Sequence, residues 1–153
     1  MLHVVKGNLL TSDCTVIGHQ CNCFSTMGAG IAKQIKAMFP QVYKADQEFP
    51  LEPKERLGKM SFAEIPNGYF FNLYGQFHYG TDKKQTDYEA LASALTLMQQ
   101  QIEIIKQERS EMQVKIGFPF GMGCGLAGGD WSIVEKMIAR VFDGYDVYLY
   151  QLK

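Results

Sequence analysis

Short strand-like runs alternate along the chain with stretches of helical periodicity, and this alternation restricts the possible folds more than any other feature of the sequence. Each strand-like run is rich in β-branched or aromatic residues, and there are six, at residues 2–6, 14–19, 59–65, 69–73, 114–118 and 147–152. This order predicts an α/β sandwich in which helices cover both faces of a largely parallel sheet. In such sheets, ligands bind beyond the carboxyl ends of the strands.

The clearest predicted helix begins at Thr86, which forms an S/T-x-x-E capping box with Glu89. Apolar residues then recur at spacings of three and four, as expected for one buried helical stripe: Tyr88, Leu91, Leu95, Met98, Ile102 and Ile105. Another helix is predicted before Pro40, which ends or restarts it, and a last one after an N-cap at Asp130 or Ser132.

The composition is that of a soluble globular protein. The chain has 153 residues, the size of one ordinary domain, so we expect a single domain over residues 1–153. Hydrophobic residues make up 46%, and no stretch approaches the ~20 apolar residues of a membrane span. The first seven residues lack the features of a secretory signal, which predicts a cytoplasmic protein with reduced thiols at Cys14, Cys21, Cys23 and Cys124.

Charge and cysteine spacing argue against two kinds of site. The formal net charge of -1 is unlike that of proteins that grip a long phosphate backbone, so an anionic ligand would be held by local geometry. One residue separates Cys21 from Cys23 and no second ligand pair follows, whereas zinc sites use two to four intervening residues. We therefore expect neither a metal nor a cofactor.

Two glycine-rich segments each follow a predicted strand and open a predicted helix. In residues 16–33, a strand leads through a polar loop into Gly28-Ala29-Gly30, and in residues 118–131, five glycines fall among the nine residues 121–129. Glycine lets the backbone approach a ligand closely, and the free N–H groups of a first helical turn point at an anion. A phosphate cradle explains the second cluster better than a plain connection, while a simple turn remains the alternative for the first.

Residues 123–128 also spell G-x-G-x-x-G, the fingerprint of dinucleotide-binding folds. That fingerprint belongs to an early βαβ unit with an acidic residue at the end of the next strand, whereas this one precedes the last helix and the last strand. Asp146 stands before the final strand, where it cannot easily reach a ribose. The context therefore argues against a nicotinamide-dependent oxidoreductase, and the sequence contains no Walker A motif.

Four blocks of sequence, in this order, resemble the macro domain family over essentially the whole chain. They are residues 5–10, His19-Gln20-Cys21-Asn22 with Met27-Gly28-Ala29-Gly30-Ile31-Ala32, Gly123-Cys124-Gly125-Leu126, and an aromatic residue near the end of the final strand. The resemblance implies the macro-domain three-layer α/β/α sandwich, with a central mixed, largely parallel six-stranded sheet. The pattern looks most like the compact branch that contains the ADP-ribose-1″-phosphate phosphatases and the terminal ADP-ribose glycohydrolases.

The resemblance assigns ligand contacts by position. Asn8 stands where an acidic residue accepts a hydrogen bond from the adenine amino group, and an ordinary turn residue is the alternative. Leu9 would offer its backbone N–H to adenine, and Tyr150 would stack on the ring, with Tyr148 on the same strand face as the competing candidate. Asn22 would bind the distal ribose. The phosphates and that ribose would also contact Gly28, Ala29, Gly30, Ile31, Gly121, Met122, Gly123, Cys124, Gly125 and Leu126.

The predicted catalytic residues are His19, Asn22 and Asp130. A histidine suits proton transfer beside a phosphate, with the aspartate as its partner. The alternatives are a hydrogen-bonded core role for His19, a loop cap for Asn22 and a helix N-cap for Asp130. The branch that uses a lysine nucleophile fits poorly, because Tyr74-Gly75-Gln76-Phe77 contains no lysine and Ala127 stands where that branch has an aspartate.

The sequence thus predicts an enzyme that binds ADP-ribose and hydrolyses an ADP-ribose derivative, first of all by removing phosphate from ADP-ribose-1″-phosphate. The alternatives are a non-catalytic ADP-ribose reader module and a de-ADP-ribosylating hydrolase without a lysine nucleophile. A third class, weak recognition of single-stranded nucleic acid, rests on the 12% of aromatic residues. We expect a monomer that contacts no membrane, with ADP-ribosylated protein or nucleic acid as further partners.

Overall fold

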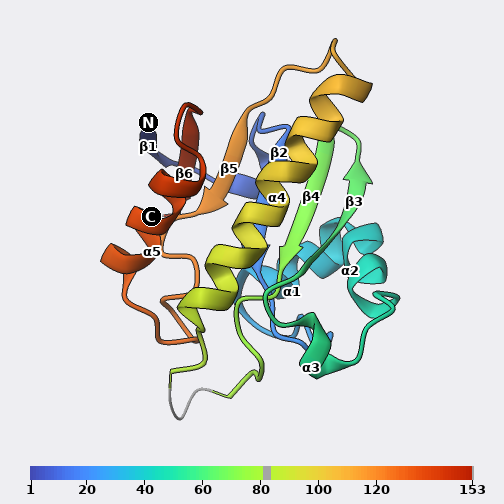
Figure 1. Ribbon diagram of the computed structural model, residues 1–153, viewed down its shortest axis with the longest axis vertical. Helices are drawn as coiled ribbons and strands as arrows, with labels where there is room; N and C mark the ends of the chain where they lie inside the picture. The colour runs from blue at the N-terminus through green and yellow to red at the C-terminus, as the bar shows by residue number, and fades with distance from the viewer. Residues whose placement is uncertain (81–83, 153) are drawn as a thin grey trace.

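The computed structural model describes residues 1–80 and 84–152 (Figure 1). Its elements, in chain order, are β1 (Leu2–Lys6), the 3-10 helix η1 (Leu9–Thr11), β2 (Val16–Gln20), α1 (Gly30–Met38), α2 (Pro40–Gln47), α3 (Pro53–Arg56), β3 (Met60–Ile65), β4 (Gly68–Leu73), α4 (Tyr88–Glu108), β5 (Ile116–Pro119), α5 (Trp131–Val141) and β6 (Val147–Gln151). All six predicted strands are present, with bounds that differ from the predicted ones by at most two residues. Pro40 restarts the helix rather than ending it, because it occupies the first turn of α2.

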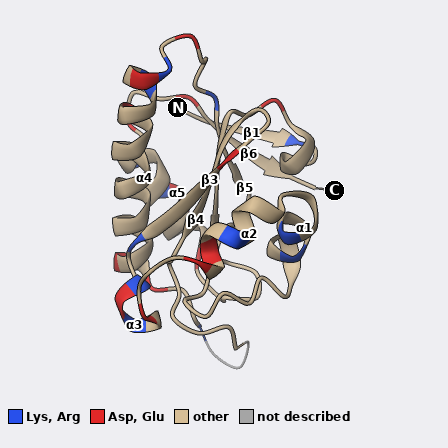
Figure 2. Cartoon of the chain, turned by 90° about the vertical axis from the view of Figure 1, so that its right-hand side faces the viewer, with Lys and Arg blue, Asp and Glu red and all other residues tan. Residues whose placement is uncertain are grey.

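The strands form one six-stranded sheet in the order β1-β6-β5-β2-β4-β3. All neighbouring pairs are parallel except β3 with β4, which are antiparallel. Figure 2 shows the sheet edge-on, with α4 and α5 on one face and α1 and α2 on the other. The predicted three-layer sandwich with a mixed, largely parallel sheet is confirmed.

Two apolar clusters, one on each face, hold these layers together. Successive residues of a strand point to opposite faces, so a strand covered on both sides must be apolar at nearly every position. Accordingly, Val16 of β2 packs into the cluster under α4 and α5, and the next residue, Ile17, into the cluster under α1 and α2. In β4, Phe71 likewise packs into the cluster under α4 and α5, and Phe70 into the cluster under α1 and α2.

The start of α4 differs from the prediction. Asp87 is the N-cap and accepts a hydrogen bond from the Ala90 N–H at 3.0 Å, so the capping box assigned to Thr86 and Glu89 is wrong. The Thr86 hydroxyl instead donates to the Gly123 carbonyl at 2.6 Å, a contact between residues far apart in the sequence. The predicted apolar stripe of α4 is buried from Leu91 onward, because its spacing depends only on the helical period.

The topology brings the two glycine-rich segments together at one edge of the sheet. The first loop, residues 21–29, connects β2 to α1, and the second loop, residues 120–130, connects β5 to α5. Because β2 and β5 are parallel neighbours, both loops leave the sheet at adjacent carboxyl ends. Across the described residues, no helix combines the length and the apolar composition that a membrane span requires.

Candidate functional site

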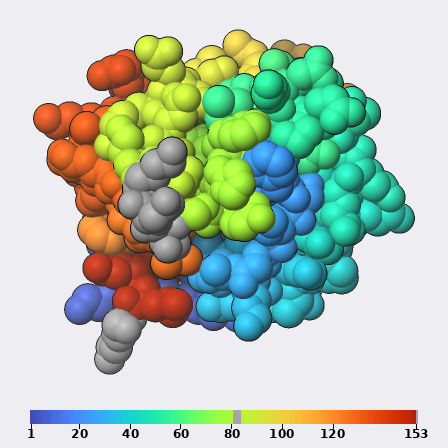
Figure 3. Space-filling model, turned by 90° about the horizontal axis from the view of Figure 1, so that it is seen from below, coloured from blue at the N-terminus to red at the C-terminus, as the bar shows by residue number. Residues whose placement is uncertain are grey.

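A pocket of about 730 Å³ lies between the first loop and the second loop, a size typical of ligand sites. Figure 3 views this edge of the molecule, where the first loop (blue), the segment that follows β4 (yellow-green) and the second loop (orange) lie on one face. The described wall residues are His19, Gln20, Cys21, Asn22, Thr26, Met27, Gly28, Ala29, Gly30, Ile31, Ala32, Asp46, Gln76, Tyr79, Gly80, Pro119, Phe120, Gly121, Met122, Gly123, Gly125, Leu126 and Ala127.

A second hollow of about 330 Å³ continues from the first toward the end of β6. The two hollows share Gly30, Ile31, Pro119 and Phe120. The remaining walls of the second hollow are Asn8, Leu9, Gln34, Tyr150, Gln151 and Leu152. An elongated ligand could therefore run from Tyr150 to Asn22 across the N-terminus of α1.

The N-terminus of α1 faces both hollows and is uncapped. Ala29 is its N-cap residue, no side chain caps it, and no acidic residue occupies its first turn. The N–H groups of a first helical turn have no partner within the helix, so those of α1 are available to an anion in the pocket. The N-terminus of α5 differs, since the Asp130 carboxylate accepts from the Ser132 N–H at 3.0 Å and already caps that helix.

The second loop presents free backbone donors. Gly121, Gly123 and Gly128 have φ values of 78°, 77° and 74°, in the left-handed region that favours glycine. Within the described residues, no backbone acceptor is found for the N–H groups of Gly123, Gly125 or Leu126, which all line the pocket. The four contact positions predicted in the first loop and at the helix start, Gly28, Ala29, Gly30 and Ile31, also line it. These donors lie where the sequence predicts a phosphate cradle, and phosphate binding there stays a prediction.

Among the ligand contacts predicted in the second loop, Cys124 is the residue that lines neither hollow. Its thiol donates to the Met122 carbonyl at 3.4 Å, and the side chain packs against the apolar cluster under α4 and α5. The Cys124 side chain therefore packs on the core side of the second loop, away from the pocket.

Asn22 lines the pocket and also ties the first loop to itself. Its Oδ1 accepts from the Phe24 N–H at 2.8 Å, and its Nδ2 donates to the Thr26 hydroxyl at 2.7 Å. The predicted loop-cap role is thus observed. An amide still has one N–H and one lone pair left for a ligand, so the ribose role stays a prediction.

The predicted pairing of His19 with Asp130 is not what the structure shows. His19 is fully buried, its Nε2 lies 2.7 Å from the Asn72 Oδ1, and burial lowers its pKa to about 4. Asp130 caps α5 and lines neither hollow, and among the described residues no hydrogen bond joins the two side chains. Both residues therefore occupy the structural roles that the sequence left open as alternatives.

Cys21 touches His19 in an arrangement that superficially resembles a thiol-histidine nucleophile. The Cys21 sulfur lies 3.2 Å from the His19 Nε2, the same nitrogen that contacts Asn72. Burial raises the pKa of the Cys21 thiol well above its usual range, so it stays protonated. This buried contact is unsuited to nucleophilic attack. Among the described residues, no three His, Cys, Asp or Glu side chains gather as a metal site would require.

Sequence reasoning missed Gln20, which joins several walls of the pocket. Its Nε2 donates to the Gln76 Oε1 and to the Thr86 hydroxyl, both at 2.9 Å, and Thr86 in turn bonds the second loop at Gly123. The Gln20 Oε1 is buried and has no hydrogen-bond partner among the described residues. Its place between His19 and Cys21 in the motif was the signal that could have identified it.

Asp46 is another wall residue that the sequence reasoning missed. It is 1% exposed, its Oδ1 accepts from the Tyr74 hydroxyl at 2.7 Å, and its Oδ2 has no partner in the described residues. Burial raises the pKa of its carboxyl above the usual range. Its spacing of four from the buried Val42 places it on the inner face of α2, which was a readable signal.

The second hollow distinguishes between the two candidate tyrosines. Tyr150 lines it together with Asn8 and Leu9. Tyr148 is instead stacked on His3, with ring centroids 4.9 Å apart, and does not line it. The Asn8 Oδ1 accepts from the Leu10 N–H at 2.9 Å, so its turn role is observed, and its amide donors remain open to a ligand.

Comparisons with known proteins agree with this geometry, although no protein-family model matches the chain. An uncharacterized 17.5 kDa protein of Enterobacteria phage T4 is 30% identical over 141 residues, 88% of this chain and 85% of the phage protein. The ADP-ribose 1″-phosphate phosphatase of Debaryomyces hansenii is 25% identical and matches 98% of both chains. The DNA ADP-ribosyl glycohydrolase of Mycobacterium tuberculosis is 25% identical, but this chain spans only 39% of its length.

Solved structures show the same fold. The macrodomain of Mycobacterium tuberculosis DarG superposes with a TM-score of 0.71 at 24% identity, over 98% of this chain and 97% of that one. Thermosipho africanus DarTG in complex with ADP-ribose gives a TM-score of 0.74 at 24% identity, over 98% of this chain and 41% of that one. The shared fold, the two glycine loops and these relatives show that the chain belongs to the macro domain family.

Proposed function

We propose that residues 1–153 act as one macro domain that binds ADP-ribose across the two joined hollows and hydrolyses the bond between its C1″ carbon and the group attached there. One observation carries the proposal: the hollows form a continuous path from an aromatic ring, Tyr150, past the uncapped N-terminus of α1, to the polar Asn22. Along this path, the adenine base would meet an aromatic ring, the diphosphate would meet N–H donors, and the distal ribose would meet a polar side chain.

Adenine would occupy the second hollow. Tyr150 offers a ring face for stacking, and the Leu9 backbone and the Asn8 amide offer polar contacts at the edge. The diphosphate would then lie against the N-terminus of α1 and the free N–H groups of Gly123, Gly125 and Leu126. Backbone donors explain how a chain of net charge -1 would hold an anion.

The distal ribose would lie beside Asn22, with its C1″ carbon facing the segment that follows β4. We propose that a water attacks C1″. The water oxygen bonds to that carbon, the bond to the leaving group breaks with its electron pair, and the water proton goes to the leaving group. ADP-ribose with a C1″ hydroxyl is then released together with the protonated leaving group. With phosphate as the leaving group, the substrate is ADP-ribose-1″-phosphate.

Positioning would supply most of the rate, because the geometry leaves His19 and Asp130 in structural roles. The named activities of the yeast phosphatase and the mycobacterial glycohydrolase support hydrolysis of this kind. In the glycohydrolases that use a lysine nucleophile, the lysine follows the strand that corresponds to β4. Here Gln76 lies in that segment and lines the pocket, which favours a reaction without a covalent intermediate. A module that only reads ADP-ribose is the second candidate, favoured by the burial of His19 and by the helix-capping role of Asp130.

The test is release of inorganic phosphate from ADP-ribose-1″-phosphate in ¹⁸O-labelled water. Attack at C1″ leaves the released phosphate without label, whereas attack at phosphorus would label it. We expect slow turnover. Asn22→Ala should weaken transition-state binding by about 1–3 kcal/mol, since it removes a polar contact to the ribose. Asn22→Asp, the matched control for the loop, keeps the acceptor for the Phe24 N–H.

His19→Gln and Asp130→Ser should retain the parent's rate if positioning dominates. A large loss in either variant, with melting temperature unchanged, would restore the acid-base pair that the sequence suggested. If the parent binds ADP-ribose but releases no phosphate above background, the reader module replaces the enzyme.

We also propose that the protein works as a cytoplasmic monomer. All four cysteines are free thiols, as expected in a reducing compartment. Light scattering on the purified chain tests the monomer, and ADP-ribosylated protein and nucleic acid remain the proposed macromolecular partners.

A further inference from the structure

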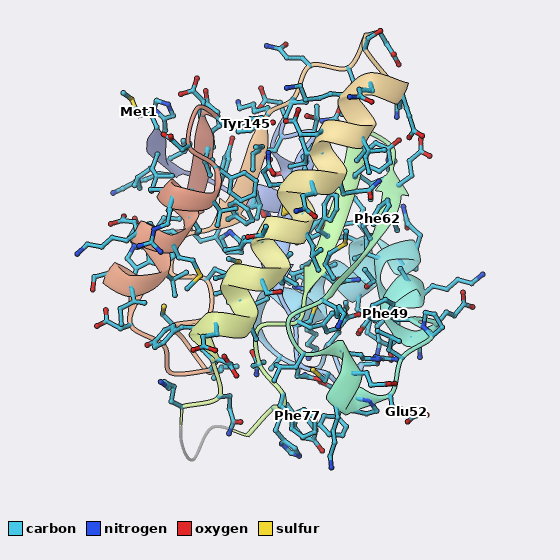
Figure 4. The ribbon with its side chains drawn as sticks, in the orientation of Figure 1. Met1, Phe49, Glu52, Phe62, Phe77 and Tyr145 are labelled. Carbon is cyan, nitrogen blue, oxygen red and sulfur yellow. The ribbon has the colours of Figure 1, made fainter. Side chains whose placement is uncertain are left out.

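Asn8 and Leu9 form a polar corner of the second hollow. They follow β1 at the carboxyl edge of the sheet and share the hollow with Tyr150, near the end of the neighbouring strand β6. Figure 4 shows where this edge lies, because β6 begins after Tyr145 in the upper part of the molecule and runs in the same direction as β4, which ends before Phe77 at the lower edge. A base stacked on Tyr150 would therefore present its edge to this corner.

The hydrogen-bond acceptors of the corner are already occupied. The Asn8 Oδ1 accepts from the Leu10 N–H at 2.9 Å, and the Asn8 carbonyl accepts from the Thr11 N–H at 3.2 Å. The Leu9 carbonyl accepts from the Ser12 N–H at 3.2 Å and from the Ser12 hydroxyl at 2.7 Å. A rotated Asn8 amide would bring Nδ2 against the Leu10 N–H, so that two donors would face each other. The Leu10 contact thus fixes which end of the amide remains for a ligand.

Two donors remain at the corner, the Asn8 Nδ2 and the Leu9 N–H. In the part of the chain that the structure describes, neither group has an acceptor. None of the described wall residues of the second hollow is an Asp or a Glu. The other side-chain amides in these walls belong to Gln34 and Gln151, which are exposed and can rotate. The corner therefore offers a ligand a fixed pair of neighbouring donors.

A purine base meets this pair differently according to the group on its C6 carbon. Adenine carries an amino group there, so each ring acceptor beside it, N7 or N1, is paired with a donor. One of the two protein donors would then face the amino group and lose its hydrogen bond. A 6-oxopurine, guanine or hypoxanthine, presents N7 and O6 as two adjacent acceptors. Such an edge can accept from both protein donors at once.

Resting on the proposed function, which puts the base of the ligand in the second hollow, we propose that Asn8 makes this hollow selective for a 6-oxopurine. The preferred class of ligand is then a diphosphoribose of hypoxanthine or guanine, and ADP-ribose binds less tightly. The stack on Tyr150 and the contacts to the diphosphate and the distal ribose are common to both kinds of ligand. The selectivity therefore arises at the edge of the base.

Calorimetry with ADP-ribose and with inosine diphosphate ribose tests the inference, because the two ligands differ only in the base. We expect the parent to bind the inosine compound about tenfold more tightly. Asn8→Asp keeps an acceptor for the Leu10 N–H and turns an acceptor toward the hollow in place of the donors. It should reverse the preference to about tenfold in favour of ADP-ribose, whose amino group then has a partner. The added charge repels both diphosphates alike, so the ratio of the two affinities is the readout.

Asn22→Asp is the matched control. It makes the same change from amide to carboxylate at the other end of the site and keeps an acceptor for the Phe24 N–H. It should change both affinities by the same factor, and melting curves check that both variants are folded. A parent that binds ADP-ribose as tightly as the inosine compound, or more tightly, would overturn the inference, as would a ratio that Asn8→Asp leaves unchanged or that Asn22→Asp shifts equally. In each of these cases the proposed function stands. If neither ligand binds the parent, the proposed function itself fails.

Discussion

The two loops that enclose the pocket are held in place by different parts of the chain. The first loop is held by side chains: the Arg56 Nη1 donates to the Ser25 hydroxyl at 2.7 Å and to the Asp46 carbonyl at 3.2 Å. The Ser25 hydroxyl in turn lies 3.1 Å from that carbonyl. Ser25 and Met27 have φ values of 56° and 39°, a conformation that non-glycine residues rarely adopt, so the anchor behind them must hold it.

The second loop is held mainly by backbone hydrogen bonds, together with the Thr86 hydroxyl that donates to its Gly123 carbonyl. The Gly129 N–H donates to the Gly123 carbonyl at 2.9 Å, and the Ala127 carbonyl accepts from the Gln85 N–H at 2.7 Å. Glycines occupy its left-handed positions, so it needs no anchoring side chain to hold them. From this contrast we expect the removal of anchoring side chains to disturb mainly the first loop. The second loop should be disturbed mainly by replacement of particular glycines.

The largest expected effect is on the anchor of the first loop. Arg56 is 7% exposed and donates four hydrogen bonds. Its Nη1 also lies 3.7 Å from the Asp46 Oδ1, so Arg56→Ala leaves that buried carboxyl without its cation. We expect the free energy of unfolding to fall by about 3–5 kcal/mol, measured by urea denaturation. Arg109→Ala removes two exposed ion pairs, to Glu64 and Glu111, and should stay close to the parent. A small effect at Arg56 would mean that the first loop does not depend on this anchor.

Low pH should lower the free energy of unfolding through a buried histidine beside the first loop. His19 lies on β2 just before that loop, and its pKa is lowered to about 4 by burial, whereas an unfolded histidine titrates near 6.5. Its contribution is complete above pH 6.5 and is lost as the pH falls toward 4, because the unfolded chain binds the proton first.

The loss should be about 3 kcal/mol across that range, since each pKa unit is worth 1.36 kcal/mol. Unfolding curves of the parent and His19→Gln at several pH values measure it, and the variant should show a shallower decline. Parallel curves for the two proteins would show that His19 is not held neutral.

A carboxylate in the second loop should abolish binding without unfolding the protein. A Cβ at Gly125 meets nothing within 4 Å and its φ is not in the left-handed region, so Gly125→Glu fits the backbone. It puts a negative charge among the proposed phosphate donors, and the affinity for ADP-ribose should fall by more than about 100-fold. Ile133→Glu, on an exposed part of α5, carries the same charge and should bind like the parent. Calorimetry measures both.

The smallest expected effect separates two glycines of the second loop. Gly123 has a φ of 77°, and a Cβ there would lie 3.0 Å from the Gln20 Oε1, so Gly123→Ala should cost about 1–2 kcal/mol of stability. Gly125→Ala has neither constraint and should unfold like the parent. Equal melting curves for the two alanine variants would show that the backbone conformation at Gly123 does not contribute to the stability of the second loop.

The features that depend on local period were predictable from sequence, and those that depend on long-range contacts were not. The α4 stripe from Leu91 to Ile105 and the alternation of strands and helices follow from periodicity, and the two loops follow from glycine clusters after strands. The choice of Asp87 over Thr86 as N-cap was not predictable, because a distant partner, Gly123, engages the threonine. Both Thr86 and Asp87 have a side-chain oxygen that can cap a helix N-terminus.

The candidate site shows the same limit. Periodicity puts Tyr148 and Tyr150 on one strand face, and only their contacts in space separate them, because His3 stacks on Tyr148 while Tyr150 lines the second hollow. For His19 and Asp130, residue type allowed catalysis and structure equally, and their neighbours in space assign the structural roles.

Calorimetric titration of the parent with ADP-ribose and with AMP tests the central claim most directly, because only ADP-ribose is long enough to engage Tyr150, both loops and Asn22 together. We expect ADP-ribose to bind at least about tenfold more tightly than AMP, since the distal phosphate and ribose add contacts that AMP lacks. Equal affinity for the two ligands, or no binding of ADP-ribose, would contradict a site that spans both loops.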